Sequence, residues 1–461
     1  MNALILSALF GIILMLSSIV IKNKSLFKHI VAIELLVLLA TAYAELRGNI
    51  LFHVNVNNML AFNHFNIYIS VIIIASTLLF VLLCGKQIEN VGLHVAEYFA
   101  LLFFILCGSF MVVSFQNLLI LFLGIEIISI PLYILTGSDK KNLKSNEASL
   151  KYFLMGAFST GLMLMGIALM YGATGSFQLS VLQIGTLGGY SFVELAGMAL
   201  LFVAMLFKVS AAPFHFWTPD VYDGAPTVFT SFMATIVKTT SLIAFIHLFE
   251  NKFETLPPTW SLSISIIIIL TLFIGNITAI FQQSVKRMLA YSSIAQAGFM
   301  LFPLLTNNVI AKEGIALYTV AYSIATIGIF AILMHMKDYT LEGFNGLAQK
   351  QPLLAAANTI FLLSLAGIPL TAGFFAKYYM LSSVIKTGQY LWLIIIAVFF
   401  AAVSVYYYFR VIQAMYFKQS IEGGLITTHI SFRFKIGIFI LALFILFIGV
   451  FPQAILYWIY F

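Results

Sequence analysis

The stretch FVAMLFKVSAAPFHFWTPD, residues 202–220, begins as an apolar helix and then changes character. Lys208 follows six apolar residues, Pro213 comes five positions later, and His215 comes two after that. A charge at the centre of a membrane helix costs about 2.5–3.5 kcal/mol on insertion scales, and a proline leaves the carbonyl four residues earlier without its hydrogen bond. Irregular backbone is tolerated in a membrane only where protein or water covers it. The stretch therefore predicts a broken membrane helix with a polar site at the break.

The composition of the whole chain supports a membrane location. The 461 residues are 62% hydrophobic and 8% charged, with a mean hydropathy of +1.07, whereas a soluble domain has roughly 25% charged residues. A bilayer-spanning helix needs about 20 apolar residues. Such runs predict an all-α polytopic membrane protein with about 14 transmembrane helices, at residues 2–21, 29–46, 65–84, 97–114, 116–136, 148–172, 193–212, 226–249, 260–281, 288–305, 313–335, 353–385, 389–409 and 434–458.

The first of these runs is expected to be a retained helix. It has no positively charged region before it and no small-residue cleavage site after it, both of which a signal peptide would show. If the spans alternate across the membrane, the odd-numbered loops carry fifteen Lys and Arg residues and the even-numbered loops carry four. Basic loops face the cytoplasm. We therefore expect a multi-pass protein of the bacterial cytoplasmic (inner) membrane with both termini outside the cytoplasm.

Four lysines remain inside the apolar spans. Such residues usually face protein or water, pair with one another and mark ion or proton paths. Snorkelling of the side chain to the membrane surface is the alternative explanation, and it fits Lys151 best and Lys238 least. Two acids also lie in spans: Glu126, near mid-span, and Glu34, for which a structural hydrogen bond is as good an explanation as a functional role. The four lysines are Lys151, Lys208, Lys238 and Lys377.

A second interruption resembles the first. In LLSLAGIPLTAGFFAKYYML, Gly367, Pro369 and Gly373 break the long span 353–385, and Lys377 follows. Paired interruptions in two halves of a chain are typical of inverted-repeat transporters. Spans 4–8 and 9–13 are predicted to form two inverted five-helix repeats with broken helices 7 and 12. The expected organisation is an N-terminal three-helix segment, the two repeats and a C-terminal helix, at residues 1–96, 97–249, 250–418 and 419–461.

No cofactor or metal site is expected in this chain. The histidines show no His-x3-His spacing, and two cysteines, Cys84 and Cys107, are too few for a four-thiolate cluster. No glycine-rich phosphate-binding motif occurs. The sequence therefore gives no indication that the chain itself carries out redox chemistry or hydrolysis.

Three stretches resemble a known family. KVSAAPFHFWTPDVYDGAPT (208–227), QQSVKRMLAYSSIAQAGFM (282–300) and AGIPLTAGFFAKYYML (366–381) are similar to the antiporter-like subunits of respiratory complex I and to the related Mrp-type cation/proton antiporters. The stretch FHFWTPDVYDGAP most closely resembles the corresponding segment of the N-type subunits of bacterial NADH-quinone oxidoreductase. The resemblance covers essentially the whole chain.

The resemblance implies a role for six residues. Glu126 corresponds to the carboxylate that pairs with the lysine of span seven, here Lys208, and Lys151 to a lysine that modulates the pair. His215 looks like a bridging histidine beside the break. Lys238 and Lys377 resemble the central and terminal lysines of a proton-transfer line.

The function implied is proton translocation coupled to electron transfer from NADH to quinone. FMN, iron–sulfur clusters and quinone would then belong to partner subunits, and the partners would be other membrane-arm subunits, including neighbouring antiporter-like and small ones. An Mrp-type cation/proton antiporter subunit is the alternative within the same fold. A non-transporting membrane scaffold is a third possibility, which the lysines inside the spans disfavour. Whether H⁺ or Na⁺ is carried stays open.

Overall fold

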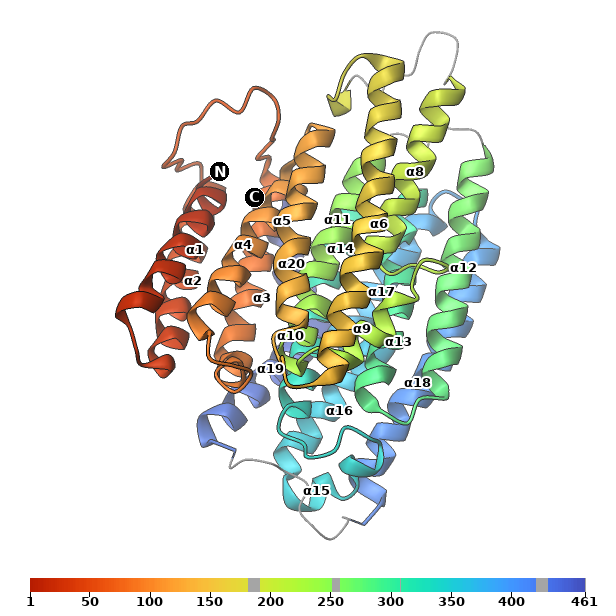
Figure 1. The fold of residues 1–461 in the computed structure, drawn as a ribbon. Helices are drawn as coiled ribbons and strands as arrows, with labels where there is room; N and C mark the ends of the chain where they lie inside the picture. The colour runs from red at the N-terminus through yellow and green to blue at the C-terminus, as the bar shows by residue number, and fades with distance from the viewer. Residues whose placement is uncertain (181–190, 251–257, 307, 420–429, 461) are drawn as a thin grey trace. The chain divides into compact units, whose positions relative to one another are not determined.

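A computed structural model describes residues 1–180, 191–250, 258–306, 308–419 and 430–460. Within these ranges the chain is helical (Figure 1), and its β-structure is limited to isolated bridges such as Ser284 with Thr340. The first half contains α1 (Asn2–Val20), α2 (Lys24–Leu46), α3 (His64–Ile88), α4 (Val95–Ser114), α5 (Leu118–Thr136), α6 (Leu143–Thr174), α8 (Phe192–Lys208), α9 (Trp217–Gly224), α10 (Thr227–Phe232), a π-helix (Met233–Val237) and α11 (Lys238–Phe249).

The second half continues in the same manner. It contains α12 (Pro258–Ile280), α13 (Val285–Met300), α14 (Val309–Leu333), α15 (Leu347–Lys350), α16 (Pro352–Ala366), α17 (Ala372–Ile385), α18 (Leu391–Phe417), α19 (Phe432–Val450), α20 (Gln453–Leu456) and 3₁₀ turns at Phe302–Leu305, Glu342–Phe344 and Tyr457–Ile459.

Twelve helices among the described residues are long and apolar enough to cross a membrane. They match twelve of the predicted spans. The other two predicted spans, 193–212 and 353–385, are helical but interrupted: α8 ends after 17 residues at Lys208, and α16 and α17 have 15 and 14 residues. The two spans in which the sequence shows a break are thus the two that form no long helix.

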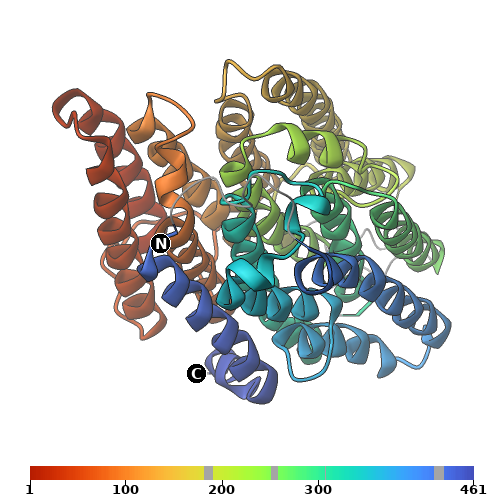
Figure 2. The ribbon, with the colours of Figure 1, turned by 90° about the horizontal axis from the view of Figure 1, so that it is seen from below.

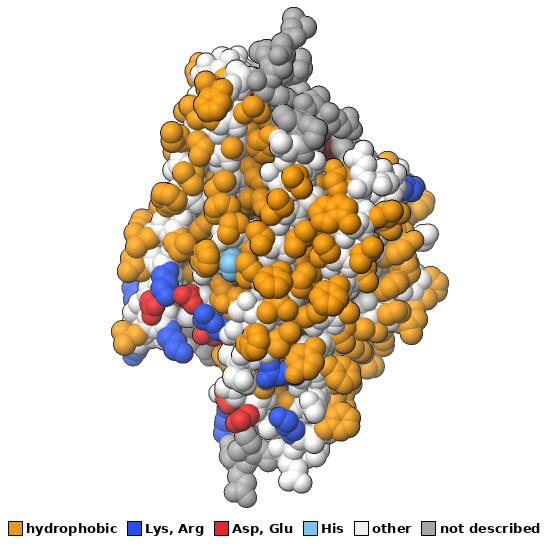
Figure 3. Space-filling view, turned by 90° about the vertical axis from the view of Figure 1, so that its right-hand side faces the viewer, with side chains coloured by type: hydrophobic (Ala, Val, Ile, Leu, Met, Phe, Trp, Pro, Cys, Tyr) orange, Lys and Arg blue, Asp and Glu red, His pale blue; other side chains and the backbone are white. Residues whose placement is uncertain are grey.

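The surface agrees with a lipid environment. Large apolar side chains are exposed along several of the long helices, for example Ile19, Phe158 and Ile395, each more than 70% exposed. On the face shown in Figure 3, hydrophobic side chains cover most of the surface, and the charged side chains gather mainly toward its lower part. An apolar surface of this extent is typical of a protein that faces lipid or other membrane subunits.

The chain divides into two compact units. Unit 1 contains residues Met1–Ser210, Gly224–Phe229 and Ile236–Leu256, and unit 2 contains Ala211–Asp223, Thr230–Thr235 and Pro257–Phe461. Within unit 1, α1 lies beside α2 and α4, and α2 lies beside α3 and α4 (Figures 1 and 2). Helices α5, α6 and α8 follow α4 as successive neighbours.

Close packing in unit 1 depends on small residues. A Cβ atom on Gly108 of α4 would lie 2.7 Å from the carbonyl oxygen of Gly124 on α5, and one on Gly166 of α6 would lie 2.9 Å from the carbonyl oxygen of Gly197 on α8. Since lipid supplies little hydrophobic force between helices, association depends on such close contact. The glycines therefore fix the positions of α5 and α8, which carry Glu126 and Lys208.

Within unit 2, α14 is the central helix. All of its membrane-spanning window is buried, and it packs against α16, α17 and α19. A helix that is buried on every side can carry polar groups away from lipid. Helix α14 does so, with Tyr318, Tyr322, Ser323 and Thr326 along its length.

Candidate functional site

The first break follows Lys208 directly. Val209 donates its N–H to the carbonyl of Met205, Ser210 adopts the left-handed conformation at φ 62°, and the Ala212–Pro213 peptide bond is cis. A non-glycine residue with positive φ is uncommon and often lies at a functional turn. The break predicted from Pro213 is therefore present, and it ends α8 at the lysine itself.

Lys208 meets α5 at this position. Its Nζ donates a hydrogen bond of 3.0 Å to Oγ of Ser129, which lies three residues after Glu126 and is 3% exposed. Glu126 is close enough for its charge to attract Lys208. Its Oε1 is nevertheless buried without a hydrogen-bond partner. In the described part of the chain, the ion pairs within 4.0 Å do not include one between Glu126 and Lys208. The structure thus brings the two groups together with the pair open.

Lys151 has a different environment. Its Nζ lies 2.7 Å from Oε1 of Glu147, one turn earlier on α6, and the two side chains are 42% and 64% exposed. This ion pair is local to the surface of α6. The sequence alternative, a lysine that extends toward the membrane surface, is consistent with this exposure.

Lys238 is almost completely buried, with 3% of its surface exposed. It begins α11 directly after the π-helix Met233–Val237. A π-bulge leaves irregular carbonyl bonding and is frequent at functional sites. Here threonine hydroxyls compensate, because Thr239 and Thr240 both donate to the carbonyl of Ile236, at 3.1 and 2.7 Å. The lysine is therefore placed at an irregular, polar point of an otherwise apolar helix.

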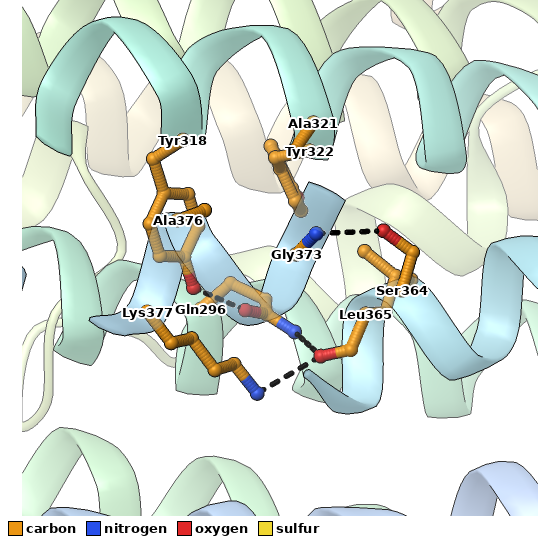
Figure 4. A pocket seen from close by; sticks show the side chains of 9 residues that line it. All are labelled: Gln296, Tyr318, Ala321, Tyr322, Ser364, Leu365, Gly373, Ala376 and Lys377. Carbon is orange, nitrogen blue, oxygen red and sulfur yellow. Dashed lines mark hydrogen bonds between the residues drawn. The ribbon is translucent and has the colours of Figure 1, made fainter. Parts of the chain in front are cut away.

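Lys377 lies at the second break, within unit 2 (Figure 4). Its Nζ donates to the carbonyl oxygen of Leu365, as Figure 4 shows. It also donates to that of Ala366, and both distances are 2.9 Å. These are two of the last carbonyls of α16, which have no partner inside the helix and form the negative end of its dipole. The ring centroid of Phe299 lies 4.7 Å from Nζ. A positive charge is thus stabilised here by backbone carbonyls and an aromatic face.

A small polar pocket adjoins Lys377 and is shown in Figure 4. Gln296 donates to the carbonyl of Leu365 at 2.9 Å and to the hydroxyl of Tyr408 at 3.1 Å, and it accepts a hydrogen bond from Tyr318. The pocket has a volume of about 10 Å³, close to the least that holds one water molecule.

Helix α14 carries further buried hydroxyls. Tyr322, which lines the pocket, has a buried hydroxyl without a hydrogen-bond partner. The same is true of the hydroxyls of Ser323 and Thr326. These hydroxyls make α14 a polar stretch in the interior of unit 2.

His215 is buried in the segment that follows the first break, with 5% of its surface exposed. Its carbonyl accepts a hydrogen bond of 2.9 Å from the N–H of Thr218 at the start of α9, and its ring lies 4.7 Å from that of Phe216. In the chain it is seven residues beyond Lys208, on the opposite side of the break.

Side chains that could bind a metal ion do not cluster in the described part of the chain. Among the described residues, no group of three or more His, Cys, Asp or Glu side chains could hold a metal ion. Cys84 is buried, Cys107 is partly buried, and both are free thiols. Glu34 lies on α2 with 9% exposure, and its Oε2 has no hydrogen-bond partner.

Several polar residues of these sites were missed by sequence reasoning. Ser129 could have been found from its position three residues after Glu126, since residues i and i+3 share a helix face. Gln296 could have been found as a lone amide in the apolar run SSIAQAGFM. The aromatic hydroxyls of Tyr318, Tyr322 and Tyr408 could not, because tyrosine is common throughout the chain.

These features define a class of protein. Lysines within or beside interrupted membrane helices are typical of transporters that carry ions across the bilayer. A comparison with family models matches residues 116–404 to the family described as NADH:quinone oxidoreductase/Mrp antiporter, transmembrane.

Comparison with individual proteins narrows this class. The chain is 40% identical to NADH-quinone oxidoreductase subunit N of Cytophaga hutchinsonii, over 99% of both chains, and 38% identical to the subunit N of Trichlorobacter lovleyi, over 92% of this chain and 88% of that one. A chain of respiratory complex I from Thermus thermophilus is 30% identical and superposes with a TM-score of 0.84, over 98% of this chain and 97% of the other. The chain belongs to the family of NADH-quinone oxidoreductase subunit N proteins.

A chain of the Mrp complex from Dietzia has the same fold. Its TM-score is 0.84 over 99% of this chain and 96% of that chain, and the two sequences are 18% identical. At this identity the similarity concerns the fold alone.

Proposed function

We propose that this chain translocates protons in the membrane arm of NADH-quinone oxidoreductase, while its partner subunits transfer electrons from NADH to quinone. The observation that carries the proposal is the open Glu126–Lys208 pair: two opposite charges on adjacent packed segments, with the lysine at the end of a broken helix. The family relationship over nearly the full chain supports the same activity.

The mechanism is electrostatic. A nearby carboxylate favours the protonated form of a lysine, and burial disfavours it. When Lys208 closes on Glu126, its charge is compensated; when the pair opens, the charge becomes available to the next group. Lys238 and Lys377 are the following proton carriers in the line. His215 and Lys151 complete the proposed set, as a bridge beside the break and as a modulator of the pair.

The proposed topology has fourteen crossings, with both termini outside the cytoplasm. Spans 4–8 and 9–13 form two five-helix repeats, and the odd number of spans inverts the second relative to the first. The segments are 1–96, 97–249, 250–418 and 419–461. Support comes from the two interruptions, after α8 and between α16 and α17, which hold the same rank in the two repeats.

Cofactors and neighbours follow from the same proposal. FMN, iron–sulfur clusters and quinone are bound by partner subunits, and this chain binds none of them. Its partners in the membrane are neighbouring antiporter-like and small subunits. Supporting observations are the family relationship and the large apolar side chains exposed on the surface.

Replacement of Glu126 by Gln tests the function. The variant keeps the shape of the side chain and removes the charge that favours protonated Lys208. A change of one unit in the pKa of a lysine is a tenfold change in its ratio of protonated to neutral form. We therefore expect NADH-driven proton pumping to fall by up to roughly tenfold in assembled complexes. The measurement is pumping in membrane vesicles, normalised to NADH oxidation and to the amount of complex.

Glu342→Gln is the matched control. Glu342 is exposed in the 3₁₀ turn Glu342–Phe344, outside the proposed proton line, so its replacement should leave pumping within about twofold of wild type, as expected for an exposed charge. Full pumping by an assembled Glu126→Gln complex would contradict the proposed role of the pair.

A further inference from the structure

Lys208 has a choice of two partners on α5. Its Nζ is bonded to Oγ of Ser129 at 3.0 Å, while the carboxylate of Glu126, one turn away on the same helix, keeps a buried oxygen without a hydrogen bond. A buried carboxylate oxygen normally finds a donor. Lys208 is thus bonded to the neutral Ser129, while the charged carboxylate of Glu126 lies nearby with an unsatisfied oxygen.

The orientation of Ser129 suits it to hold a lysine. Its hydroxyl donates to the carbonyl of Ile125, four residues earlier, at 2.7 Å. Because the single hydroxyl proton is used in that bond, the oxygen presents only its lone pairs to Lys208. Ser129 therefore acts as a fixed acceptor. It can accept a hydrogen bond from Lys208 whether or not the lysine carries its extra proton.

The two partners differ in what they do to the lysine. A carboxylate stabilises the ammonium form specifically, whereas a serine oxygen accepts a hydrogen bond from an ammonium or from a neutral amine. Lys208 bound to Ser129 is thus more ready to release a proton than Lys208 bound to Glu126.

The hydroxyl of Tyr133, which is also on α5, lies beside Ser129 and close enough to Glu126 to interact with its charge. Tyr133, four residues after Ser129, packs edge-on against Tyr152 of α6, with ring centroids 4.9 Å apart. The charged residues Glu147 and Lys151 of α6 pair with each other on the exposed surface. On the α4 side, Gly124 meets Gly108 at close contact.

We propose that Ser129 is a positioning residue that holds Lys208 in the open state of the ion pair. Closing the pair means exchanging the Ser129 hydrogen bond for one to Glu126. This inference rests on the proposed function of the pair and adds a third residue, which sets the balance between its two states.

The experiment compares three variants of Ser129 in assembled complexes. Ser129→Ala removes the acceptor, so Lys208 should move to within 4.0 Å of Glu126 in a structure of the variant. A hydrogen bond to a charged group contributes enough to change such an equilibrium about tenfold, and we expect pumping per NADH to fall by roughly that factor. Ser129→Thr keeps the hydroxyl and should retain most of the pumping. Ser129→Cys, with a weaker acceptor, should fall between them and serves if the Ala variant does not assemble.

Ser109→Ala is the matched control for burial and packing. Ser109 is fully buried on α4 and donates to the carbonyl four residues earlier, at 2.8 Å, as Ser129 does. Its replacement should leave pumping unchanged. Equal losses in the Ser129→Ala, Ser129→Thr and Ser109→Ala complexes would show a packing effect and overturn the inference.

A double variant separates this inference from the proposed function. In the Glu126→Gln background the competing charge is absent, so adding Ser129→Ala should cause no further loss. Wild-type pumping by Glu126→Gln alone would refute the proposed function of the pair. A loss in Glu126→Gln together with wild-type pumping, and an unmoved Lys208, in Ser129→Ala would refute only the role of Ser129.

Discussion

Three of the lysines inside the predicted spans are stabilised by different partners. Lys208 is bonded to a serine oxygen beside an unsatisfied carboxylate, Lys377 is bonded to two helix-terminal carbonyls, and Lys151 is paired with an exposed glutamate. A carboxylate close by favours the ammonium form more strongly than a carbonyl dipole does. These differences are consistent with the proposed line of groups that exchange a proton in sequence.

Lys238 provides the clearest residue-scale test. It is 3% exposed and lies eleven residues from either end of the helical stretch Thr227–Phe249, or roughly 16 Å at 1.5 Å per residue. Its side chain cannot reach either surface. Lys238→Met fills a similar volume and removes a charge whose burial is costly, so we expect assembly to be retained, with equal or higher thermal stability, and pumping to be lost.

Lys238→Arg is the companion variant. Arginine keeps the charge but holds its proton too tightly to release it, so it should also assemble and fail to pump. The measurement is NADH-driven acidification of vesicles, alongside thermal unfolding of the complex. Assembled Lys238→Met complexes that pump with wild-type stoichiometry would show that Lys238 is not on the proposed proton path.

At the scale of the helical elements, the second break depends on two glycines. Gly367 ends α16 in the left-handed conformation at φ 83°, which exposes the carbonyls that bind Lys377. Gly373, in the first turn of α17, lies so close to α16 that a Cβ atom would overlap the carbonyl oxygen of Ser364. The Gly373 N–H also donates a hydrogen bond to Oγ of Ser364 at 3.1 Å, which holds the first turn of α17 against α16.

Gly373→Ala should therefore disrupt the break. The added methyl group meets backbone that cannot move aside without displacing α16 or α17, and overpacking of this kind costs about 1–3 kcal/mol or more. We expect lower thermal stability of the complex and loss of pumping.

Gly161→Ala is the control for this element. Gly161 lies within α6 with no atom within 4 Å of an added Cβ, so alanine should leave stability unchanged or raise it by up to about 1 kcal/mol through helix propensity. A Gly373→Ala complex as stable and active as Gly161→Ala would show that the close contact between α16 and α17 is not required.

At the scale of the whole molecule, the arrangement of charges predicts orientation. Fifteen basic residues in the odd loops against four in the even loops predict that the odd loops lie in the cytoplasm. A cysteine introduced at His53, between α2 and α3, should react with an impermeant thiol reagent added from outside. A cysteine at Lys141, between α5 and α6, should not.

Both positions are exposed in the structure, so accessibility depends on the side of the membrane. The native thiols, Cys84 and Cys107, are buried and partly buried, and they should be replaced in the parent protein to lower background labelling. Reaction at 141 but not at 53 would reverse the proposed topology.

The sequence by itself determined the class of structure. Apolar runs of membrane-spanning length have no alternative to helix in a bilayer, because every backbone polar group must be satisfied within the segment. Pro213 and Gly367 marked the two breaks for the same reason, since each prevents regular helical bonding at a fixed position. The buried lysines were identifiable from their cost in an apolar run.

Only the tertiary structure decided what each charge contacts. Ser129 reaches Lys208 from a position 79 residues earlier in the chain, and Gln296 shares the carbonyl of Leu365 from 69 residues away. Such contacts depend on which helices pack together and at what depth, and a span pattern carries neither kind of information. Tertiary structure also decided the open state of the Glu126–Lys208 pair. Glu126 and Ser129 are one helical turn apart on α5, so which of them bonds to Lys208 depends on distances that only helix packing sets.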